Sequence, residues 1–599
     1  MNFWKTLLAS LLGSFVAMGL VMLVFVLIIM AAVGSGGSQK PFEVKDNSVL
    51  HLKLDLPITE RHNKHDMQID PFSFDSEQKM GLNALVKDLK RAKDDAKIKG
   101  IFLEVQSIAA APSTVLDVRR AIADFASGGK WVVAYSEDYS QGAYYVASAA
   151  SEVYIYPQGS MDWRGINAEI SFYKNMLDKL EINAQVIRGK NNKFKSAVEP
   201  FIYDHMSAEN KEQIATFIGD IWRVMLEGIS EKRGISIEEL NRLADTLALV
   251  VPERAMEARL VDGLKYRDEV MGILKTKAGL AVDAKDKDLE LVSLEDYHRS
   301  SATEKNEEDT PDYKKDKVAV VYAVGAIESG EGDDMTIGSE RIAAALKKAR
   351  EDEKVKAIVL RVNSPGGSAL ASDVIWRETE LIKQSGKPFY VSMGDYAASG
   401  GYYISCSADK IFANANTITG SIGVFGMLPN MQNFWNNKIG ITFDRYETNP
   451  HADIISSNKP MDEVEMSYMQ AMVDDIYADF TGKVAAGRHM EVAMVDSIGQ
   501  GRVWSGEDAK NLGLVDEIGN LQDCIAAAAL QAGMTDYAVK ELPALIDPFQ
   551  QLLEELTGQK QTSMLKEALG DQYTKYENAK SFLEMCGPQV RLPFVVEIK

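Results

Sequence analysis

The chain has 599 residues and a formal net charge of −21 at pH 7. This length can bury two substantial cores, and the acidic balance argues against nucleic-acid binding, which needs a basic surface. The three cysteines, Cys406, Cys524 and Cys586, have no C-x-x-C spacing, so we predict neither a metal site nor a disulfide framework. We also predict no cofactor. Cys406 stands in an apolar segment, which indicates a core residue.

The N-terminal part holds an uncharged run at residues 6–33, rich in Leu, Val, Ile, Met and Phe. A run of about 28 residues crosses a bilayer core of about 30 Å with some tilt. Small residues at 31–35 favour the competing interpretation, a cleaved signal peptide, but the run exceeds the roughly 7–15 apolar residues of such a peptide. We therefore predict an uncleaved transmembrane anchor at 6–33, between a short segment at 1–5 and a tether at 34–47. Lysines lie on both sides of this run, so the positive-inside rule does not indicate which end of the anchor faces the cytoplasm.

Beyond the tether, strand patterns alternate with amphipathic helix patterns. This order predicts an α/β fold with crossover connections between parallel strands. In the first half, strands are predicted at 49–56, 101–105 and 131–135, and helices at 82–96 and 115–127. In the second half, strands are predicted at 318–324, 357–362 and 389–392, and helices at 339–351 and 371–384.

The two halves are copies of one another. Residues 94–105 match residues 351–362, and an offset of about 257 residues is far too long for a solenoid repeat. We predict two tandem domains, separated by a linker rich in Ser, Glu, Asp and Lys. The predicted parts are an N-terminal repeat domain at 48–297, a polar linker at 298–316, a C-terminal repeat domain at 317–540 and a helical C-terminal tail at 541–599.

The strongest candidate nucleophile is Ser399, which precedes two glycines at the end of a predicted strand. A serine hydroxyl reacts only when a base removes its proton, and neighbouring glycines permit a tight turn and close backbone approach. Ser-Gly-Gly also occurs in plain turns. However, the degraded copy at 137–145 has Gln141 at the aligned position. One copy holds the candidate and the other does not, which indicates an enzyme.

A second glycine pair follows the strand at 357–362, in Asn363-Ser-Pro-Gly-Gly-Ser368. Proline fixes one φ angle, and the glycines let backbone N–H groups face a ligand. We predict an oxyanion hole with the N–H groups of Gly367 and Gly400 as donors. A plain strand-to-helix loop is the alternative. The corresponding segment of the first half, 106–112, has no glycine pair.

The base is harder to identify. In the serine-bearing half only His451 and His489 follow the serine, each in a polar segment without a recognisable partner, which disfavours a Ser-His-Asp triad. A Ser-Lys dyad needs a lysine that is desolvated enough to be neutral. Lys195 precedes an apolar segment in the half without the serine. From pattern alone Lys190 and Lys193 are nearly equivalent to it, and a solvated basic turn is the default.

Taken together, four motifs are similar to those of the signal peptide peptidase A family in its long, duplicated form. The resemblance covers nearly the whole chain. The motifs are Lys195-Ser-Ala-Val-Glu-Pro-Phe201, Asn363-Ser-Pro-Gly-Gly367, Asp395-Tyr-Ala-Ala-Ser-Gly-Gly-Tyr-Tyr403 and Thr419-Gly-Ser-Ile-Gly-Val424.

The resemblance implies a membrane-anchored serine protease with two tandem crotonase/Clp-protease-like α/β domains after one transmembrane helix. It implies Ser399 as nucleophile, Lys195 as general base and Ser421 as the residue that orients the lysine, with Gly367 and Gly400 as oxyanion donors. Signal peptides and other apolar peptides would be the substrates. The chain would form a homo-oligomer, a tetramer by resemblance, in the bacterial inner membrane, with a single pass and periplasmic catalytic domains.

Two other functions fit parts of the pattern. A crotonase-type acyl-CoA enzyme would share the fold and the glycine-built oxyanion hole, but such enzymes usually carry a catalytic carboxylate, and none stands out. A catalytically inactive membrane scaffold would keep the fold without needing the serine, the lysine or the glycine pairs.

Overall fold

The computed structural model describes residues 42–61, 79–300, 312–546, 587–591, 597 and 598, and four isolated positions between 13 and 20. The predicted anchor at 6–33 lies outside the described residues apart from those four positions. Among the residues that are described, none of the helices combines the length and apolarity needed to cross a bilayer.

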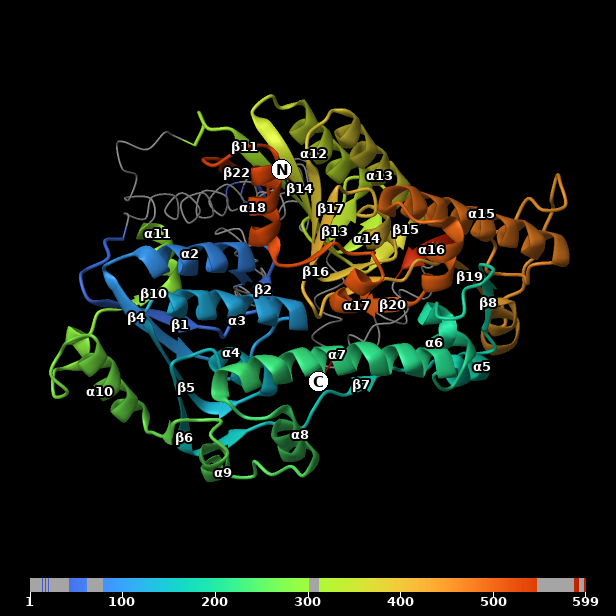
Figure 1. The fold of residues 1–599 in the computed structure, drawn as a ribbon. Coiled ribbons are helices and arrows are strands. Elements are labelled where there is room, and N and C mark those ends of the chain that lie inside the picture. Colours follow the sequence, from blue (N-terminus) through green and yellow to red (C-terminus); the bar gives the residue numbers. More distant parts are fainter. Residues whose placement is uncertain are drawn as a thin grey trace, which may run out of the picture.

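The first half forms a six-stranded parallel sheet in the order β10-β1-β4-β5-β6-β9 (Figure 1). Successive residues of a strand face opposite sides, and both faces of this sheet are covered. Ile101 and Leu103 pack with α2 and α3, while Phe102 packs with α10. The elements are β1 (Ser48–Lys53), α2 (Leu82–Asp94), β4 (Ile98–Glu104), α3 (Pro112–Ser127), β5 (Trp131–Tyr139), α4 (Gln141–Ala147), β6 (Glu152–Met161), β9 (Gly263–Leu264), α10 (Arg267–Lys277) and β10 (Leu291–Ser293).

The second half repeats this plan in a sheet of the order β20-β18-β16-β14-β11-β22, in which β17 also pairs with β16, and β21 pairs with β17. Helices α12 and α13 pack on one face and α18 on the other. The elements are β11 (Lys317–Val324), α12 (Ser339–Glu351), β14 (Val355–Ser364), α13 (Ala369–Gln384), β16 (Phe389–Ala398), β17 (Lys410–Ala413), β18 (Ile418–Gly420), β20 (Val503–Ser505), β21 (Glu517–Ile518), α18 (Leu521–Gln531) and β22 (Ala538–Leu542).

The predicted strands and helices of both halves are present, and the α/β class is confirmed. The largest difference is β16, predicted at 389–392, which continues to Ala398 because residues 396–398 pair with β18. At the other boundary, α11 (Leu294–Ser300) extends into the range predicted as linker, since Tyr297 is buried against the first core. Residues 301–311 lie outside the described part, and the domain limits stay predictions.

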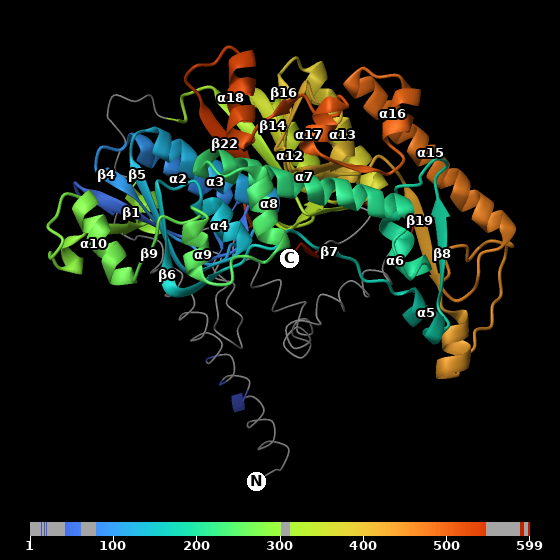
Figure 2. The same cartoon turned by 60° about the horizontal axis from the view of Figure 1, so that its bottom comes forward.

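Two elements of the first half pack on the second half, which the sequence does not predict. Strand β8 (Asn183–Arg188) of the first half pairs antiparallel with β19 (Phe425–Asn430) of the second. Helix α7 (Ala208–Arg233) begins on the second half and runs back along the first (Figures 1 and 2). Its Ile214, Phe217 and Ile221 pack with Ala398, Ile418 and Val503. Residues of the first half are thereby fixed on the second.

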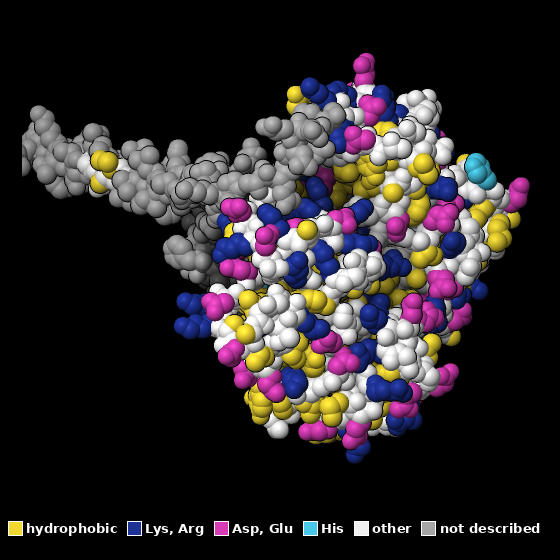
Figure 3. Space-filling model, turned by 60° about the vertical axis from the view of Figure 1, so that its left-hand side comes forward, with side chains coloured by type: hydrophobic (Ala, Val, Ile, Leu, Met, Phe, Trp, Pro, Cys, Tyr) yellow, Lys and Arg dark blue, Asp and Glu magenta, His cyan; other side chains and the backbone are white. Residues whose placement is uncertain are grey.

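Within the predicted tail at 541–599, the described residues include two strands. Strand β23 (Gly587–Arg591) lies between β15 (Gly366–Ser368) and β19 and is antiparallel to both. Strand β24 (Glu597–Ile598) pairs with β7 (Ala168–Glu169). The range 547–586, on which the predicted helical part falls, lies outside the described residues. On the face drawn in Figure 3, acidic and basic side chains are interspersed.

Phe217→Ala tests the docking of α7 on the second half. Phe217 is buried among side chains of β16, β18 and β20, so its truncation leaves a cavity and is expected to lower the unfolding free energy by about 3–5 kcal/mol. Chemical denaturation measures this change. Phe443→Ala, at an exposed phenylalanine, is the matched control and should change stability by less than about 0.5 kcal/mol. Equal effects of the two variants would contradict the packing described.

Candidate active site

Ser399 stands at the end of β16, immediately before the short helix α14 (Gly400–Tyr403), and its side chain is fully buried. Its φ of 56° lies in a region that non-glycine residues rarely adopt. The turn is held by its N–H, which donates to Gly420 O at 2.7 Å. A Cβ on Gly401 would lie 2.9 Å from Ser364 O. This sharp strand-to-helix turn presents a serine as a nucleophile elbow does.

Lys195 is buried beside it, although the two residues come from different halves of the chain. The Lys195 Nζ lies 2.9 Å from Ser399 Oγ, 2.9 Å from Ser421 Oγ and 3.2 Å from Ser421 O. Burial holds the pKa of the Lys195 amine well below its usual value of 10.5. Desolvation disfavours the charged ammonium, so the site favours a neutral amine with a free lone pair.

Ser421 contacts this amine through two of its oxygen atoms. The Ser421 hydroxyl donates to Gly501 O at 3.1 Å, which turns its oxygen lone pairs toward the lysine. A neutral amine has two N–H groups and one lone pair. If its N–H groups donate to Ser421 Oγ and Ser421 O, the lone pair is left for the proton of Ser399. Ser421 has a φ of 51° and its N–H donates to Arg502 O at 2.6 Å, so the backbone fixes this geometry.

Two residues that the sequence analysis did not single out hold the lysine loop. Gln213, buried on α7, donates to Phe194 O at 3.1 Å and to Ser196 Oγ at 2.9 Å, while Val503 N donates to its Oε1. Gly501 has a φ of 76°, and a Cβ there would lie 2.5 Å from Lys195 Cβ. In the sequence, the only sign of this role is that Gln213 stands beside the apolar positions of an amphipathic helix.

The two predicted oxyanion donors lie together. A Cβ on Gly400 would lie 3.2 Å from Gly367 N and 2.7 Å from Ser372 Oγ. A Cβ on Gly367 would lie 2.1 Å from Ile327 O. Both positions therefore need glycine for steric reasons. The glycines are brought to the turn that carries Ser399 by β15 and by the start of α14.

The surroundings of the other candidate bases differ from those of Lys195, which is buried beside Ser399. Lys190 is 86% exposed and its Nζ lies 3.8 Å from Asp474, and Lys193 Nζ lies 5.2 Å from the centre of the Phe194 ring. His489 ends α15 (Glu463–Arg488). Cys406 is buried in the second core, as predicted, and burial raises the pKa of its thiol to about 12.

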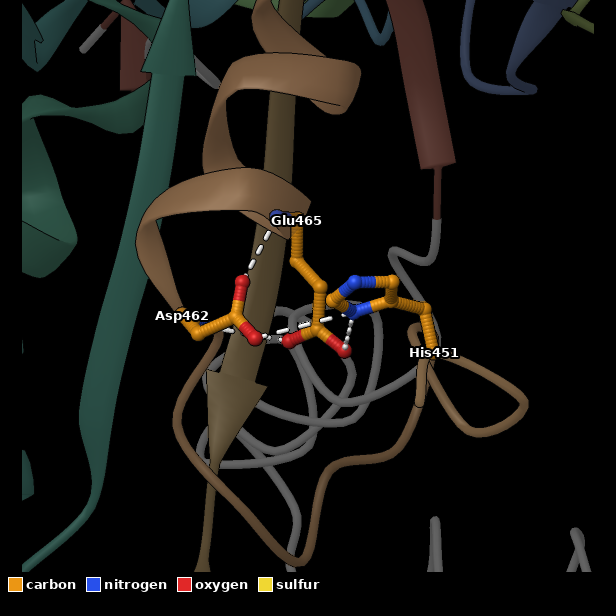
Figure 4. Close-up of side chains that lie close together, drawn as sticks. All are labelled: His451, Asp462 and Glu465. Carbon is orange, nitrogen blue, oxygen red and sulfur yellow. Dashed lines mark hydrogen bonds and ion pairs between the residues drawn. The ribbon is translucent and has the colours of Figure 1, made fainter. Parts of the chain in front are cut away.

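His451 belongs to a small cluster with Asp462 and Glu465 (Figure 4). Its Nδ1 lies 3.4 Å from Glu465 Oε1 and 3.6 Å from Asp462 Oδ2. The carboxylates already have other partners, because Lys459 Nζ lies 2.7 Å from Glu465 Oε1 and Asp462 accepts the Glu465 N–H as the cap of α15. An ammonium already occupies the position beside Glu465, so the cluster reads as a helix cap with ion pairs.

A buried serine within hydrogen-bond distance of a buried lysine, next to clustered glycines on an α/β scaffold, is the arrangement expected of a serine hydrolase site. The sequence model of peptidase family S49 matches residues 124–281 and 382–535, one segment in each half. Protease 4 of Haemophilus influenzae is 37% identical over 524 residues, which cover 85% of this chain and 83% of that protein. The chain therefore belongs to peptidase family S49 and is a serine protease.

Two further comparisons complete this picture. The chloroplastic serine protease SPPA of Arabidopsis thaliana is 31% identical over 460 residues, which cover 76% of this chain and 66% of that protein. A ClpP1 mutant from Listeria monocytogenes, at 17% identity, covers 34% of this chain and 94% of its own with a TM-score of 0.24. That score carries no argument about the fold, so the crotonase/Clp-protease-like assignment stays a prediction. Family membership decides against the acyl-CoA enzyme and the inactive scaffold.

Lys195→Met tests the electrostatics of the buried amine. Because the pKa of Lys195 is lower in the folded state than in the unfolded chain, the unfolded chain binds more protons between the two values, and the stability of the wild type rises with pH across that interval. Methionine lacks this dependence. We expect the variant to be more stable than the wild type at pH 7, and its advantage to shrink as the pH approaches about 10.5.

Thermal unfolding of both proteins across this pH range measures the difference. Lys190→Met, at the exposed lysine, is the control and should show no such trend. An advantage of Lys195→Met that stays constant with pH would contradict a lowered pKa.

Gly501→Ala tests how tightly the lysine must be placed. Its Cβ would displace Lys195 by collision at 2.5 Å, and a shift of this kind is expected to lower kcat by about 10²-fold. Gly386→Ala is a close control, since Gly386 has nearly the same φ, 77°, with no atom within 4 Å of the added Cβ. It should share the backbone strain and keep the wild-type kcat. Similar kcat values for the two variants would refute the contact.

Proposed function

We propose that the chain is a membrane-anchored endopeptidase that degrades cleaved signal peptides, with Ser399 and Lys195 as a catalytic dyad divided between two homologous domains. The observation that carries the proposal is the 2.9 Å separation of Lys195 Nζ from Ser399 Oγ at a fully buried site where desolvation alone shifts the amine pKa. Among the described residues no carboxylate contributes to that shift, so burial acts alone and disfavours the charged form.

The reaction follows from these positions. Lys195 Nζ takes the proton of Ser399 as Oγ attacks the scissile carbonyl carbon, and the carbonyl oxygen becomes an oxyanion between the N–H groups of Gly367 and Gly400. The intermediate collapses when Lys195 returns the proton to the leaving amine, which leaves an acyl ester on Ser399. Lys195 then deprotonates a water that attacks this ester, and the proton returns to Ser399 Oγ.

The substrate class is argued from the strands beside the serine. Strand β23 pairs with β15 on one side and β19 on the other, so the gap between β15 and β19 accepts an extended backbone. We infer that a substrate peptide binds in the same manner, as an added strand, in place of residues 587–591. Phe425 and Met427 of β19 are buried in an apolar cluster of the protein itself, so they do not identify the substrate. Signal peptides follow from the family resemblance.

The remaining parts of the proposal concern location and assembly. The apolar run at 6–33 would anchor the chain by a single pass in a bacterial inner membrane, with the catalytic domains on the periplasmic side. The chain would also assemble into a homo-oligomer, which the family resemblance indicates to be a tetramer. These statements rest on that apolar run and on the resemblance.

Ser399→Ala and Lys195→Ala test the dyad. Each removes a group that transfers or receives the reacting proton, so each is expected to lower kcat/KM for a synthetic signal peptide by at least about 10³-fold. The assay uses the full chain in detergent. In the wild type, kcat/KM should fall on the acid side as Lys195 becomes protonated.

Lys190→Ala is the matched control and should cleave at the wild-type rate. If Lys195→Ala keeps its activity, another group is the base. If the wild type cleaves polar peptides and leaves signal peptides intact, the substrate class is wrong while the dyad stands.

A further inference from the structure

A buried ionic network joins the two domains next to the active site. Arg361 of β14 is 1% exposed, and its Nε and Nη2 donate to the two carboxylate oxygens of Glu60, both at 3.0 Å. Glu60 belongs to the first half of the chain, directly after β2 (Ile58–Thr59). Arg361 also donates to Ser392 Oγ and Met393 O on β16. A bidentate pair of this kind fixes direction as well as distance.

Asn363 connects this pair to the loop that carries Gly367. Its side-chain amide donates to Glu60 Oε1 and to Asp395 Oδ2, both at 3.0 Å, while its Oδ1 accepts the Tyr396 N–H at 3.1 Å. Asn363 stands four residues before Gly367, and Asp395 stands four residues before Ser399. The same contacts therefore hold both strands, β14 and β16, just before they reach the reacting groups.

The first half makes a second set of hydrogen bonds to β16. Thr114, at the start of α3, donates its backbone N–H and its hydroxyl to the Asp395 carboxylate, both at 2.8 Å. Asp117 of α3 lies 4.0 Å from Arg361 and from Arg120, and burial raises its pKa to about 6. Glu60 is thus the closest counter-charge to the buried guanidinium.

The duplicated half supplies an internal comparison. Gln106 and Asp138 are the counterparts of Asn363 and Asp395, and they also make an amide–carboxylate contact, at 3.3 Å and exposed to solvent. The counterpart of Arg361 is Glu104, which contacts His51 and Arg267. At these equivalent positions of the described residues, the buried arginine with its glutamate from the other domain occurs in the half that carries Ser399 and not in the first half.

A cavity of about 270 Å³ borders the network, lined by Glu60, Asn363 and Asp395 among others. Next to an open space, side chains and strand ends can shift unless polar contacts fix them. The ionic network is therefore well placed to set the position of the loop rather than only to add stability.

We propose that Glu60 is a positioning residue for peptide hydrolysis: by holding Arg361 and Asn363, it fixes the ends of β14 and β16 and so places the Gly367 oxyanion donor relative to Ser399. Docking of the N-terminal domain then completes the oxyanion hole as well as delivering Lys195. This inference rests on the proposed dyad and extends it.

Glu60→Gln keeps the shape of the side chain and removes its charge. We expect kcat for a synthetic signal peptide to fall by about 10²-fold with KM nearly unchanged. A peptide aldehyde, which forms a tetrahedral adduct with a serine, should lose affinity by a similar factor because it depends on the same oxyanion donors. Glu104→Gln, at the counterpart of Arg361 in the first half, is the control and should keep both values.

The double variant Glu60→Gln/Arg361→Met separates positioning from stability. Removing both charges of a buried pair is expected to restore the melting temperature lost in Glu60→Gln. If Glu60 positions the loop, kcat and aldehyde affinity stay low in the double variant. Recovery of kcat together with the melting temperature, or a wild-type kcat in Glu60→Gln, would overturn the inference. Activity that survives in Ser399→Ala or Lys195→Ala would instead overturn the proposed dyad.

Discussion

The burial of the Lys195 amine, to which the described residues offer no carboxylate partner, is the constraint on which this site depends. Water stabilises an ammonium ion strongly, so a lysine that loses water without gaining an anion is driven toward its neutral form. Lys195 is in that position because Gly501, Ser421 and α7 close around it. Each comes from a different part of the chain. Helix α7 of the first half packs on the second half, and its Gln213 holds the loop that carries Lys195.

Much of the scaffold follows from local pattern. Alternating apolar residues and glycine-rich turns predict the strands and helices of both halves, and the unequal copies of one motif draw attention to Ser399. Pattern does not separate Lys195 from Lys190 and Lys193, because what distinguishes them is burial against residues about 200–300 positions away. The resemblance to a family, rather than the spacing of charges, singles out the lysine that lies beside Ser399.

Contacts between distant segments account for the other omissions. Glu60 and Arg361 are separated by 301 residues, and each by itself reads as an ordinary surface charge. Strand β8 gives no local sign that its partner is in the other half. Duplication explains why such contacts exist, since two similar scaffolds offer equivalent edges and strand ends that can diverge separately. The exposed contact between Gln106 and Asp138 and its counterpart between Asn363 and Asp395 show how the two halves have diverged at equivalent positions.

The division of the site between two halves has a consequence for the timing of synthesis. A ribosome releases the chain from its N-terminus, so Lys195 is made well before Ser399, and the lysine pocket still lacks Gly501 when the serine first emerges. At that point a nascent chain therefore carries Ser399 while the pocket of Lys195 is still incomplete. Under the proposed dyad, peptide hydrolysis would begin only after synthesis has passed Gly501 and the two halves have docked.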